Sequence, residues 1–312
     1  MSNTPSISKI KKIILARNEL LETTRLFFKD RNVLEVDTPL LRKYSVTDPY
    51  MNAFSVFDSK NNLTGFLQTS PEYAMKIMLS RGAGDIFQLS KMFRAEEQGE
   101  IHSPEFTMLE WYREGFDHFQ LIQEVTEYIQ SILGSMTINK ISYENVFQSY
   151  LQIDPFKITF DDLRERAEGL LGDIPKNLLF DNYLTLLFSE IIEPQFEKEA
   201  ITVIHSYPVS QASLAKVSHQ QGIQTADRFE IYCGGLELAN GFNELTDASE
   251  QEHRFKEDNV IRQNLQLNEI EIDIEFLVAL KKGIPNCAGV ALGFDRLLML
   301  KEKVSNISDV IL

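Results

Sequence analysis

The chain has 312 residues, 43% hydrophobic and 25% charged, with 46 acidic against 31 basic side chains and a formal net charge of −15. This length allows one large core or two modest domains. The acidic balance argues against sequence-independent binding of nucleic acids, which depends on lysines and arginines that displace counterions from phosphates.

The N-terminal stretch predicts an amphipathic helix over residues 8–30, where apolar residues recur close to a 3.6-residue period. Arg17 and Glu19 interrupt the apolar residues and no small-residue cleavage site follows, which is not typical of a signal peptide. No apolar run approaches the roughly 18 residues of a membrane-spanning helix. We therefore expect a cytoplasmic protein with no membrane partner.

Short strands come next. The segment VLEVDTPLL, residues 33–41, reads as a strand that is broken at Pro39. Residues 54–57 and 63–68 read as two strands on either side of a DSKNN turn.

The segment TSPEYAMKIMLS, residues 69–80, predicts a helix. Thr69 or Ser70 can cap its start, and Pro71 suits the first turn. Glu72 lies where the positive end of the helix dipole favours an acid.

A charged loop lies between two strand-like runs, residues 86–93 and 106–112, which are rich in aromatic and branched side chains. The loop, FRAEEQGEIHSPEF, contains an arginine, a histidine and several acids, and we expect it to connect the arms of a long antiparallel hairpin. Taken alone, such a loop is usually only a solvated hairpin tip.

The remaining elements alternate between helices and strands. Helices are predicted at 117–133, 161–171, 177–198, 248–266, 274–282 and from Asp295, and strands at 201–204, 229–233, 236–242 and 287–292. Consecutive hairpins separated by helices indicate an α+β fold with an antiparallel sheet flanked by helices. We find no linker and no internal repeat, so residues 1–312 are predicted to form one domain.

The stretch DRFEIYCGGLELANGFNEL contains a Gly-Gly turn signal between two strand-like runs. A turn there pairs Tyr232 with Glu237 and Glu230 with Ala239. Because strand side chains alternate between faces, Glu230 and Glu237 should share one face.

These two carboxylates repel each other unless a cation lies between them, and Mg²⁺ is typically bound by one or two carboxylates together with substrate phosphates. Glu244 follows Gly241, a position we interpret as a bulge that turns Glu244 toward the same site. The alternative is a pair of exposed acids on an outer sheet face.

A third stretch, CAGVALGFDRLLML, predicts a strand that runs into a helix. Gly289, Ala291 and Gly293 carry little side-chain bulk, which permits close approach by a flat ligand. Arg296 lies beside that gap, where a guanidinium can stack on a ring and pair with phosphate. There is no GxxxxGK[ST] and no GxGxxG, so the sequence does not support a P-loop or Rossmann site.

Taken in order, VLEVDTPLL, the FRAE hairpin, ELANGFNEL and GVALGFDR resemble motifs 1 to 3 of the class II aminoacyl-tRNA synthetase catalytic core. The segments SPEFTMLEWY and ELANGFNELTD are most similar to the lysyl-tRNA synthetase branch, and the resemblance covers nearly the whole chain. Only about thirty residues precede the first motif, so we expect no OB-fold for anticodon binding. In this respect the chain is similar to the paralogues that lysylate elongation factor P.

The resemblance implies that the charged loop binds ATP. It implies that Arg94 holds the α-phosphate and that Glu96 accepts from the adenine amino group. It further implies that Phe106 and Arg296 sandwich the adenine ring and that His102 approaches the outer phosphates. Arg94 and Arg296 would thus be the catalytic residues.

Other positions match by the same resemblance. Glu230 and Glu237 match metal-binding acids for Mg²⁺, with Glu237 also near ATP, and Leu238 and Gly293 match backbone neighbours of ATP. Ser103 stands where the family usually has asparagine.

The amino-acid pocket is implied to hold carboxylates that meet the two amino groups of a lysine-like substrate. Its matching residues are Ser70, Glu72, Glu110, Tyr112, Glu244 and Ala291. Synthetases that charge tRNA with α-lysine tend to have glycine at the place of Ala291, so its methyl is expected to narrow the pocket floor.

The resemblance therefore implies a homodimeric, Mg²⁺-dependent enzyme. It would use ATP to activate lysine, with (R)-β-lysine expected, as an aminoacyl-adenylate, and transfer it to a lysine ε-amino group of elongation factor P, without binding tRNA. Two alternatives stay open: a truncated lysyl-tRNA synthetase-like enzyme that charges RNA, and a non-catalytic regulatory paralogue.

Overall fold

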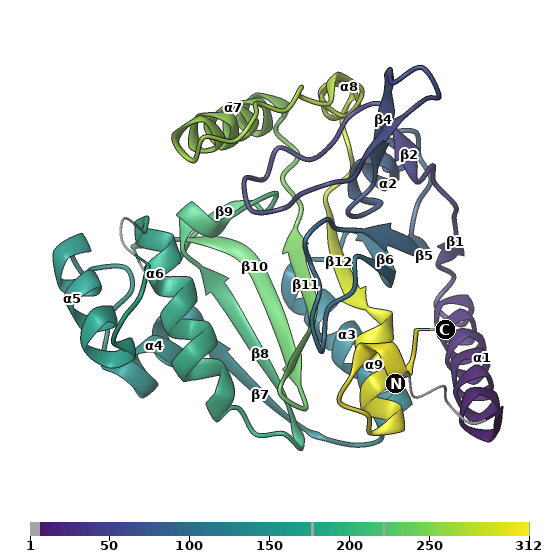
Figure 1. Ribbon diagram of the computed structural model, residues 1–312, viewed down its shortest axis with the longest axis horizontal. Coiled ribbons are helices and arrows are strands. Elements are labelled where there is room, and N and C mark those ends of the chain that lie inside the picture. The colour runs from purple at the N-terminus through teal and green to yellow at the C-terminus, as the bar shows by residue number, and fades with distance from the viewer. Residues whose placement is uncertain (1–6, 176–177, 221, 312) are drawn as a thin grey trace.

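The centre of the molecule is one large β-sheet (Figure 1). The computed structural model describes residues 7–175, 178–220 and 222–311. Within these residues nine strands form the sheet, and in spatial order they are β1 (Leu34–Glu35), β5 (Ile86–Phe93), β6 (Glu105–Glu114), β12 (Cys287–Gly293), β11 (Leu236–Asn243), β10 (Ile223–Cys233), β8 (Ala200–Tyr207) and β7 (Thr137–Ser142), with β9 (Val217–Gln220) added to β10.

The sheet is antiparallel through its middle, as predicted, but parallel at both edges, where β1 pairs with β5 and β7 with β8. A small second sheet has the order β2 (Leu41–Arg42), β4 (Leu63–Leu67) and β3 (Ser55–Phe57). The fold is therefore α+β, with a mostly antiparallel sheet flanked by helices.

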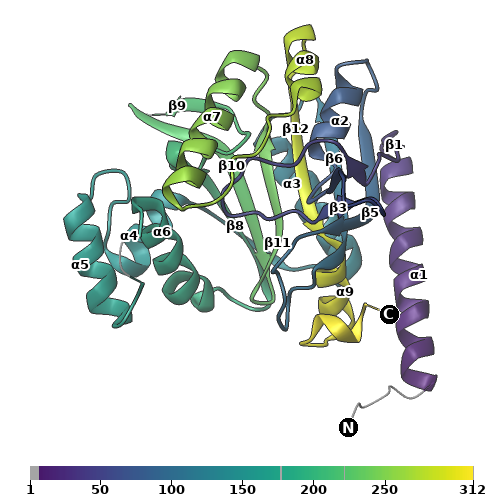
Figure 2. The same ribbon diagram turned by 45° about the horizontal axis from the view of Figure 1, so that its top comes forward.

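The helices surround the sheet. They are α1 (Ile7–Lys29), α2 (Glu72–Leu79), α3 (His118–Leu133), α4 (Tyr143–Leu151), α5 (Phe160–Leu171), α6 (Phe180–Leu187), α7 (Ala248–Asn264), α8 (Ile274–Lys282) and α9 (Phe294–Glu302). Both ribbon views show α1 beside β1 at one edge and α4 to α6 beyond β7 and β8 at the other (Figure 2). No helix in the described ranges is long and apolar enough to cross a membrane.

The main core fills the back face of the sheet, where α1, α3 and α9 pack. Alternate residues of β10 serve this face, because Phe229 and Ile231 are fully buried in the core. Their neighbours Arg228, Glu230 and Tyr232 point to the opposite, front face. Strand alternation thus leaves the front face for polar side chains.

Gly241 and Gly289 allow close packing in the sheet. A Cβ at Gly241 would overlap the Phe229 ring, and one at Gly289 would overlap Tyr112 and the Glu244 carboxylate. Gly241 pairs regularly with Phe229, so its interpretation as a bulge was wrong; its missing side chain instead makes room for an aromatic ring.

The predicted helix over 177–198 was also wrong in its extent, and residue 177 lies outside the described residues. The helix occupies Phe180–Leu187, widens into a π-helical turn at Phe188–Ile192 and ends in a 3₁₀ turn at Glu193–Gln195. Pro194 has no backbone N–H to continue an α-helix. Helix α4 and strands β7 and β9 were not predicted, whereas α8 has the predicted bounds.

A buried carboxylate joins three elements behind the front face. Asp295 Oδ1 accepts from Arg17 Nη1 (2.7 Å), and Oδ2 accepts from the backbone N–H of Thr107 (2.6 Å). Arg17 Nη2 also donates to Thr107 Oγ1 (2.5 Å). This network ties α1 and α9 to β6 and fixes the helix turn that carries Arg296.

We predict that Asp295→Ala lowers the free energy of unfolding by about 2–4 kcal/mol, because it removes the carboxylate that pairs with the part-buried Arg17 guanidinium and leaves the buried N–H of Thr107 without its acceptor. Urea denaturation measures the change. Glu35→Ala, which removes an exposed pair with Arg25 (3.0 Å), serves as the control and should cost less than about 1 kcal/mol. Equal, small effects of the two substitutions would contradict a structural role for the Asp295 network.

Candidate active site

A row of paired residues crosses the front face of the sheet. Glu230 pairs with Asn240, Asn240 with Ala291, Ala291 with Glu110, and Glu110 with Gln88. Residues directly opposite each other in a sheet point to the same face. The row therefore connects the predicted metal-binding acid with the predicted amino-acid pocket, and Ala291 lies between them.

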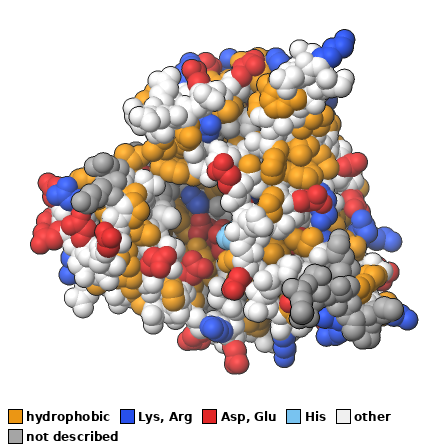
Figure 3. All heavy atoms as spheres, in the orientation of Figure 1, with side chains coloured by type: hydrophobic (Ala, Val, Ile, Leu, Met, Phe, Trp, Pro, Cys, Tyr) orange, Lys and Arg blue, Asp and Glu red, His pale blue; other side chains and the backbone are white. Residues whose placement is uncertain are grey.

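A cavity of about 330 Å³ opens on this face. Its volume lies near the lower end of the range for small-molecule sites. Figure 3 shows a hollow over β10 with acidic and basic side chains around it. Among the predicted site residues, the cavity wall includes Arg94, His102, Ser103, Phe106, Glu237, Leu238, Ala291, Gly293 and Arg296.

Arg296 joins the helix α9 to the charged hairpin. Its Nη1 donates to the backbone oxygen of Glu237 (2.7 Å), its Nη2 to His102 Nε2 (2.8 Å), and its Nε to the backbone oxygen of Ile101 (3.3 Å). Because a guanidinium can only donate, His102 accepts through Nε2 and is neutral. Burial and the neighbouring Arg296 lower the pKa of His102, which agrees with this assignment.

Arg94 and Phe106 lie on the two arms of the hairpin. The Arg94 guanidinium carbon is 5.2 Å from the Phe106 ring centroid, and its Nε is buried without a hydrogen-bond partner. Phe106 thus already has one cation on its face, from Arg94. Glu96 is not among the residues of the cavity wall: it is exposed, has a φ of 69°, and accepts from Asn52 Nδ2 (3.1 Å).

The glutamate hairpin has the predicted turn but a different register beyond it. Tyr232 pairs with Glu237, as predicted, but Leu238 has no partner, so Glu230 pairs with Asn240 instead of Ala239. The extra residue is a β-bulge in β11. Glu230 and Tyr232 are two residues apart on β10, so Glu230 and Glu237 still share the front face.

Glu230 already has a cationic neighbour within the protein. Its Oε1 lies 2.5 Å from Arg228 Nη2, and its Oε2 accepts from the Tyr232 hydroxyl (2.5 Å). Arg228 therefore supplies part of the positive charge that the neighbouring carboxylates of Glu230 and Glu237 need. Burial and the charge of Glu230 raise the pKa of Glu237 to about 7, although Arg296, Arg228 and Arg94 act in the opposite direction.

These two carboxylates fit a cation that is also held by substrate. Each oxygen of Glu230 is engaged by one donor, and a carboxylate oxygen can accept more than one contact. Among the described residues no group of three or more His, Cys, Asp or Glu side chains is arranged to hold a metal ion. A Mg²⁺ ion at Glu230 and Glu237 would thus depend on phosphate oxygens for further ligands.

Glu244 does not join the Glu230 and Glu237 pair, which corrects the interpretation from Gly241. It follows the end of β11, where its backbone N–H donates to Cys287 (3.0 Å). Its Oε2 lies 2.5 Å from Lys76 Nζ, which also donates to Glu72 Oε1 (2.6 Å). Helix α2 thus supplies an acid and a base to the amino-acid pocket.

Glu110 completes this acidic cluster from β6. It is 2% exposed, its Oε1 accepts from the Tyr112 hydroxyl (2.7 Å), and its Oε2 is buried without a partner. Burial and the nearby Glu72 raise the pKa of Glu110 to about 8. Burial and Glu72 likewise raise the pKa of Glu244 to about 7, although Lys76 acts in the opposite direction.

Ser70 has a structural role at the start of α2, where its Oγ accepts from the backbone N–H of Glu72 (3.0 Å). The prediction that Thr69 or Ser70 caps this helix was wrong, because α2 begins at Glu72 and its N-cap residue is Pro71, which makes no side-chain cap hydrogen bond. The hydrogen bond to Ser70 Oγ fixes the backbone that carries Glu72 into the pocket.

The sequence interpretation missed three charged or polar residues of the site. Lys76 lies one helical turn after Glu72, a spacing that brings side chains together. Arg228 lies two residues before Glu230, which places it on the same strand face. Asn240 has a buried Oδ1 without a partner and lies inside the quoted ELANGFNEL segment. Each position could have been found from helix or strand periodicity.

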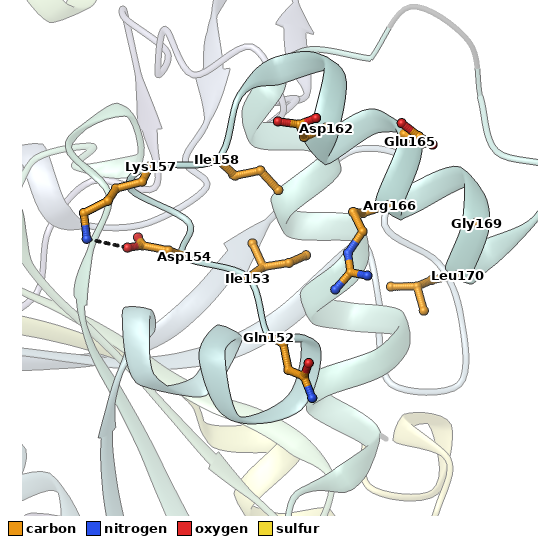
Figure 4. Close-up of a pocket in the computed structure, with 10 residues that line it drawn as sticks. All are labelled: Gln152, Ile153, Asp154, Lys157, Ile158, Asp162, Glu165, Arg166, Gly169 and Leu170. Atoms are coloured by element: carbon orange, nitrogen blue, oxygen red, sulfur yellow. Dashed lines mark hydrogen bonds and ion pairs between the residues drawn. The ribbon is translucent and has the colours of Figure 1, made fainter.

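A larger cavity of about 830 Å³ lies elsewhere, between α4, α5 and the loop that connects them (Figure 4). Both of its basic side chains have partners within the protein: Lys157 Nζ donates to Asp154 (2.6 Å), and Arg166 donates to the backbone oxygen of Leu151 (2.8 Å). The smaller cavity on the sheet therefore remains the candidate site, since predicted functional residues converge on it.

Residues 4–312 match the family described as tRNA synthetases class II (D, K and N). A protein of Histophilus somni is 47% identical over 302 residues, which cover 96% of this chain and 93% of that protein. One of Haemophilus ducreyi is 48% identical over 303 residues (95% and 92%), and one of Avibacterium paragallinarum is 46% identical over 303 residues (96% and 94%). All three are named elongation factor P--(R)-beta-lysine ligase. The chain therefore belongs to the class II tRNA synthetase family, and its sequence groups it with these ligases.

Proposed function

We propose that residues 1–312 form one catalytic domain that activates a lysine-type amino acid with ATP and transfers it to elongation factor P. The observation that carries the proposal is the row of paired residues on the front face. It places an acidic pocket around Glu110 and a cavity lined by Arg94 and Arg296 on one continuous surface. A substrate lying over Ala291 would direct its amino groups to the acids and its carboxylate to the nucleotide.

The acceptor and the preferred isomer are proposed from the relatives. Proteins 46–48% identical to this chain over nearly their whole length are named elongation factor P--(R)-beta-lysine ligase. The net charge of −15 supports a protein acceptor over tRNA, because an acidic surface disfavours a long phosphate backbone.

The proposed reaction has two steps. A carboxylate oxygen of the amino acid attacks the α-phosphorus of ATP, the bond to the β-phosphate oxygen breaks, and pyrophosphate leaves. A neutral ε-amine of the acceptor lysine then attacks the carbonyl carbon of the acyl-adenylate. AMP leaves, the amine loses a proton, and an amide bond forms.

The nucleotide half of the site would act by positioning and charge. The unpaired Nε of Arg94 can donate to the α-phosphate, where negative charge develops during the attack. His102, neutral and bound to Arg296 through Nε2, can donate from Nδ1 to an outer phosphate oxygen. Phe106 would support the adenine ring, and Glu96 would reach it only if the loop closes over the nucleotide.

Mg²⁺ would be held by Glu230 and Glu237 together with phosphate oxygens, and when bound it would neutralise charge on the triphosphate. Arg228 contacts Glu230 and would orient its carboxylate on the front face. A nearby cation would lower the pKa of Glu237, which is raised to about 7, because a positive charge favours the ionised carboxylate.

We also propose a cytoplasmic homodimer. Residues 33–41 resemble the motif that forms the class II dimer interface, and two of its leucines, Leu34 and Leu41, are 62% and 41% exposed. Apolar side chains with this exposure are suited to a two-fold interface.

We predict that the purified protein exchanges labelled pyrophosphate into ATP when a lysine isomer and Mg²⁺ are present. Elongation factor P in the same incubation should gain the mass of one lysyl group, as measured by intact-mass spectrometry. Glu237→Gln should lose about 100-fold or more of the exchange rate, because it removes a carboxylate facing the triphosphate. Glu168→Gln, on the exposed surface of α5, is the matched control and should exchange like the wild type.

Each alternative has its own outcome in this experiment. No exchange with either isomer would favour the regulatory paralogue. Exchange without a mass gain on elongation factor P, but with charging of tRNA(Lys), would favour the RNA-charging enzyme. The proposal also fails if Glu237→Gln and Glu168→Gln exchange at the same rate.

Ala291 is predicted to select between the isomers, since its methyl lies between Glu110 and Asn240 on the pocket floor. Ala291→Gly should raise kcat/KM for α-lysine by roughly 10- to 200-fold, the usual effect of one misfitting methyl or methylene group, and change kcat/KM for β-lysine less. Steady-state exchange kinetics with both isomers measure the ratio. An unchanged ratio would exclude the methyl as the discriminator and make Ser70 the next candidate.

A further inference from the structure

Lys76 is a wholly buried charged side chain in the amino-acid pocket. Its relative exposure is 0%, although lysine is almost never fully buried without a paired charge. Its Nζ lies 2.6 Å from Glu72 Oε1 and 2.5 Å from Glu244 Oε2, and it is 5.9 Å from the centroid of the Phe276 ring. Helix α2, the segment after β11 and helix α8 therefore enclose one ammonium group.

The cluster holds three carboxylates against this single ammonium. Glu72, Glu110 and Glu244 come from three different segments, and like charges at this range cannot all ionise without compensation. The Oε2 atom of Glu110 is buried and has no hydrogen-bond partner. The protein thus supplies a cation for two of the acids and leaves the third without one.

We propose that Lys76 is a positioning residue: a built-in ammonium that holds the Glu72 and Glu244 carboxyl groups in place through two ion pairs, so that Glu110 remains available for an ammonium group of the substrate. This inference rests on the proposed function, because it assigns the pocket to a lysine-type amino acid. It adds the reason why three acids can stand together in the pocket before any substrate arrives.

The arrangement also explains a preference for a substrate with two amino groups. Lys76 contacts two of the three carboxyl groups, so the third, Glu110, has no cation among the described residues to pair with. An amino acid with an apolar or amide side chain would leave Glu110 buried without a partner, which costs free energy. A second ammonium group on the substrate removes that cost.

Other titratable groups face the cluster. Burial raises the pKa of Cys287, on β12, to about 12, and raises the pKa of Tyr112 and Tyr73 well above their usual value. Lys216, which interacts with Glu244 at longer range, donates to Asn286 (2.8 Å). The glutamates therefore dominate the dependence of substrate binding on pH.

Lys76→Met tests the inference, because it removes the charge and keeps a stem of similar length. Lysine-dependent pyrophosphate exchange is measured from pH 6 to 9. We expect the KM for the lysine isomer to rise at least about 10-fold, while the KM for ATP changes less than about twofold. In a plot of log kcat/KM for the lysine isomer against pH, the rising limb should move at least about one pH unit higher. The reason is that the carboxylates bind protons more tightly without the ammonium group.

Two controls accompany this variant. Lys76→Arg keeps the positive charge and should keep the rising limb near the wild-type pH. Lys256→Met removes an exposed pair with Glu252 (2.7 Å) on α7 and should change neither KM nor the limb. If Lys76→Met does not fold, Lys76→Gln takes its place with the same expected displacement.

The outcomes separate this inference from the proposed function. No exchange by the wild type with either lysine isomer would contradict the proposed function. If the wild type exchanges pyrophosphate but Lys76→Met has the same rising limb and the same KM for lysine as the wild type, only the inference about Lys76 is overturned. A variant that loses kcat and affinity for both substrates without displacing the limb would assign Lys76 a purely structural role and likewise overturn it.

Discussion

The site depends on an electrostatic constraint, because its sheet face carries more buried carboxylates than can ionise together without cations. Arg228 contacts Glu230, and Lys76 bridges two glutamates of the amino-acid pocket. The pKa values of Glu110, Glu237 and Glu244 are nevertheless raised to about 8, about 7 and about 7, since burial and neighbouring acids outweigh the nearby bases. Of these, Glu110 and Glu237 have no ion pair with a base in the part of the chain that the structure describes, and they are the positions proposed for positive groups of a substrate or a metal ion.

The backbone imposes this constraint through strand pairing. The register that places Glu230, Ala291 and Glu110 in one row is set by three neighbouring antiparallel ladders. Gly289 has no Cβ, which lets Tyr112 and Glu244 approach each other over β12. Behind the sheet, the Asp295 network fixes the start of α9, so that Arg296 reaches the charged hairpin. The hairpin and the acids are thus parts of one rigid front face.

The parts of this arrangement that could be predicted from the sequence are those set by residues a few positions apart. The long hairpin and helix α8 follow from periodicity and turn residues, which act over a few positions. The bulge at Leu238 does not, because a Gly-Gly turn fixes only the first pairs of a hairpin and packing decides the rest. Lys76 was missed because a Glu and a Lys four residues apart usually form an exposed helix pair. Only the fold brings Glu244 to the same ammonium and buries both Lys76 and Glu244.

We infer that buried acids in the site remain uncompensated until substrates bind. The direct test is the free energy of unfolding of the substrate-free protein between pH 5 and 8, compared with that of the double variant Glu110→Gln, Glu237→Gln. Both pKa values are higher in the folded than in the unfolded chain, so the folded state holds more protons in this range and the acids destabilise it increasingly as pH rises. The wild type should therefore lose stability relative to the double variant as pH increases, whereas a difference that stays constant or reverses would contradict the account.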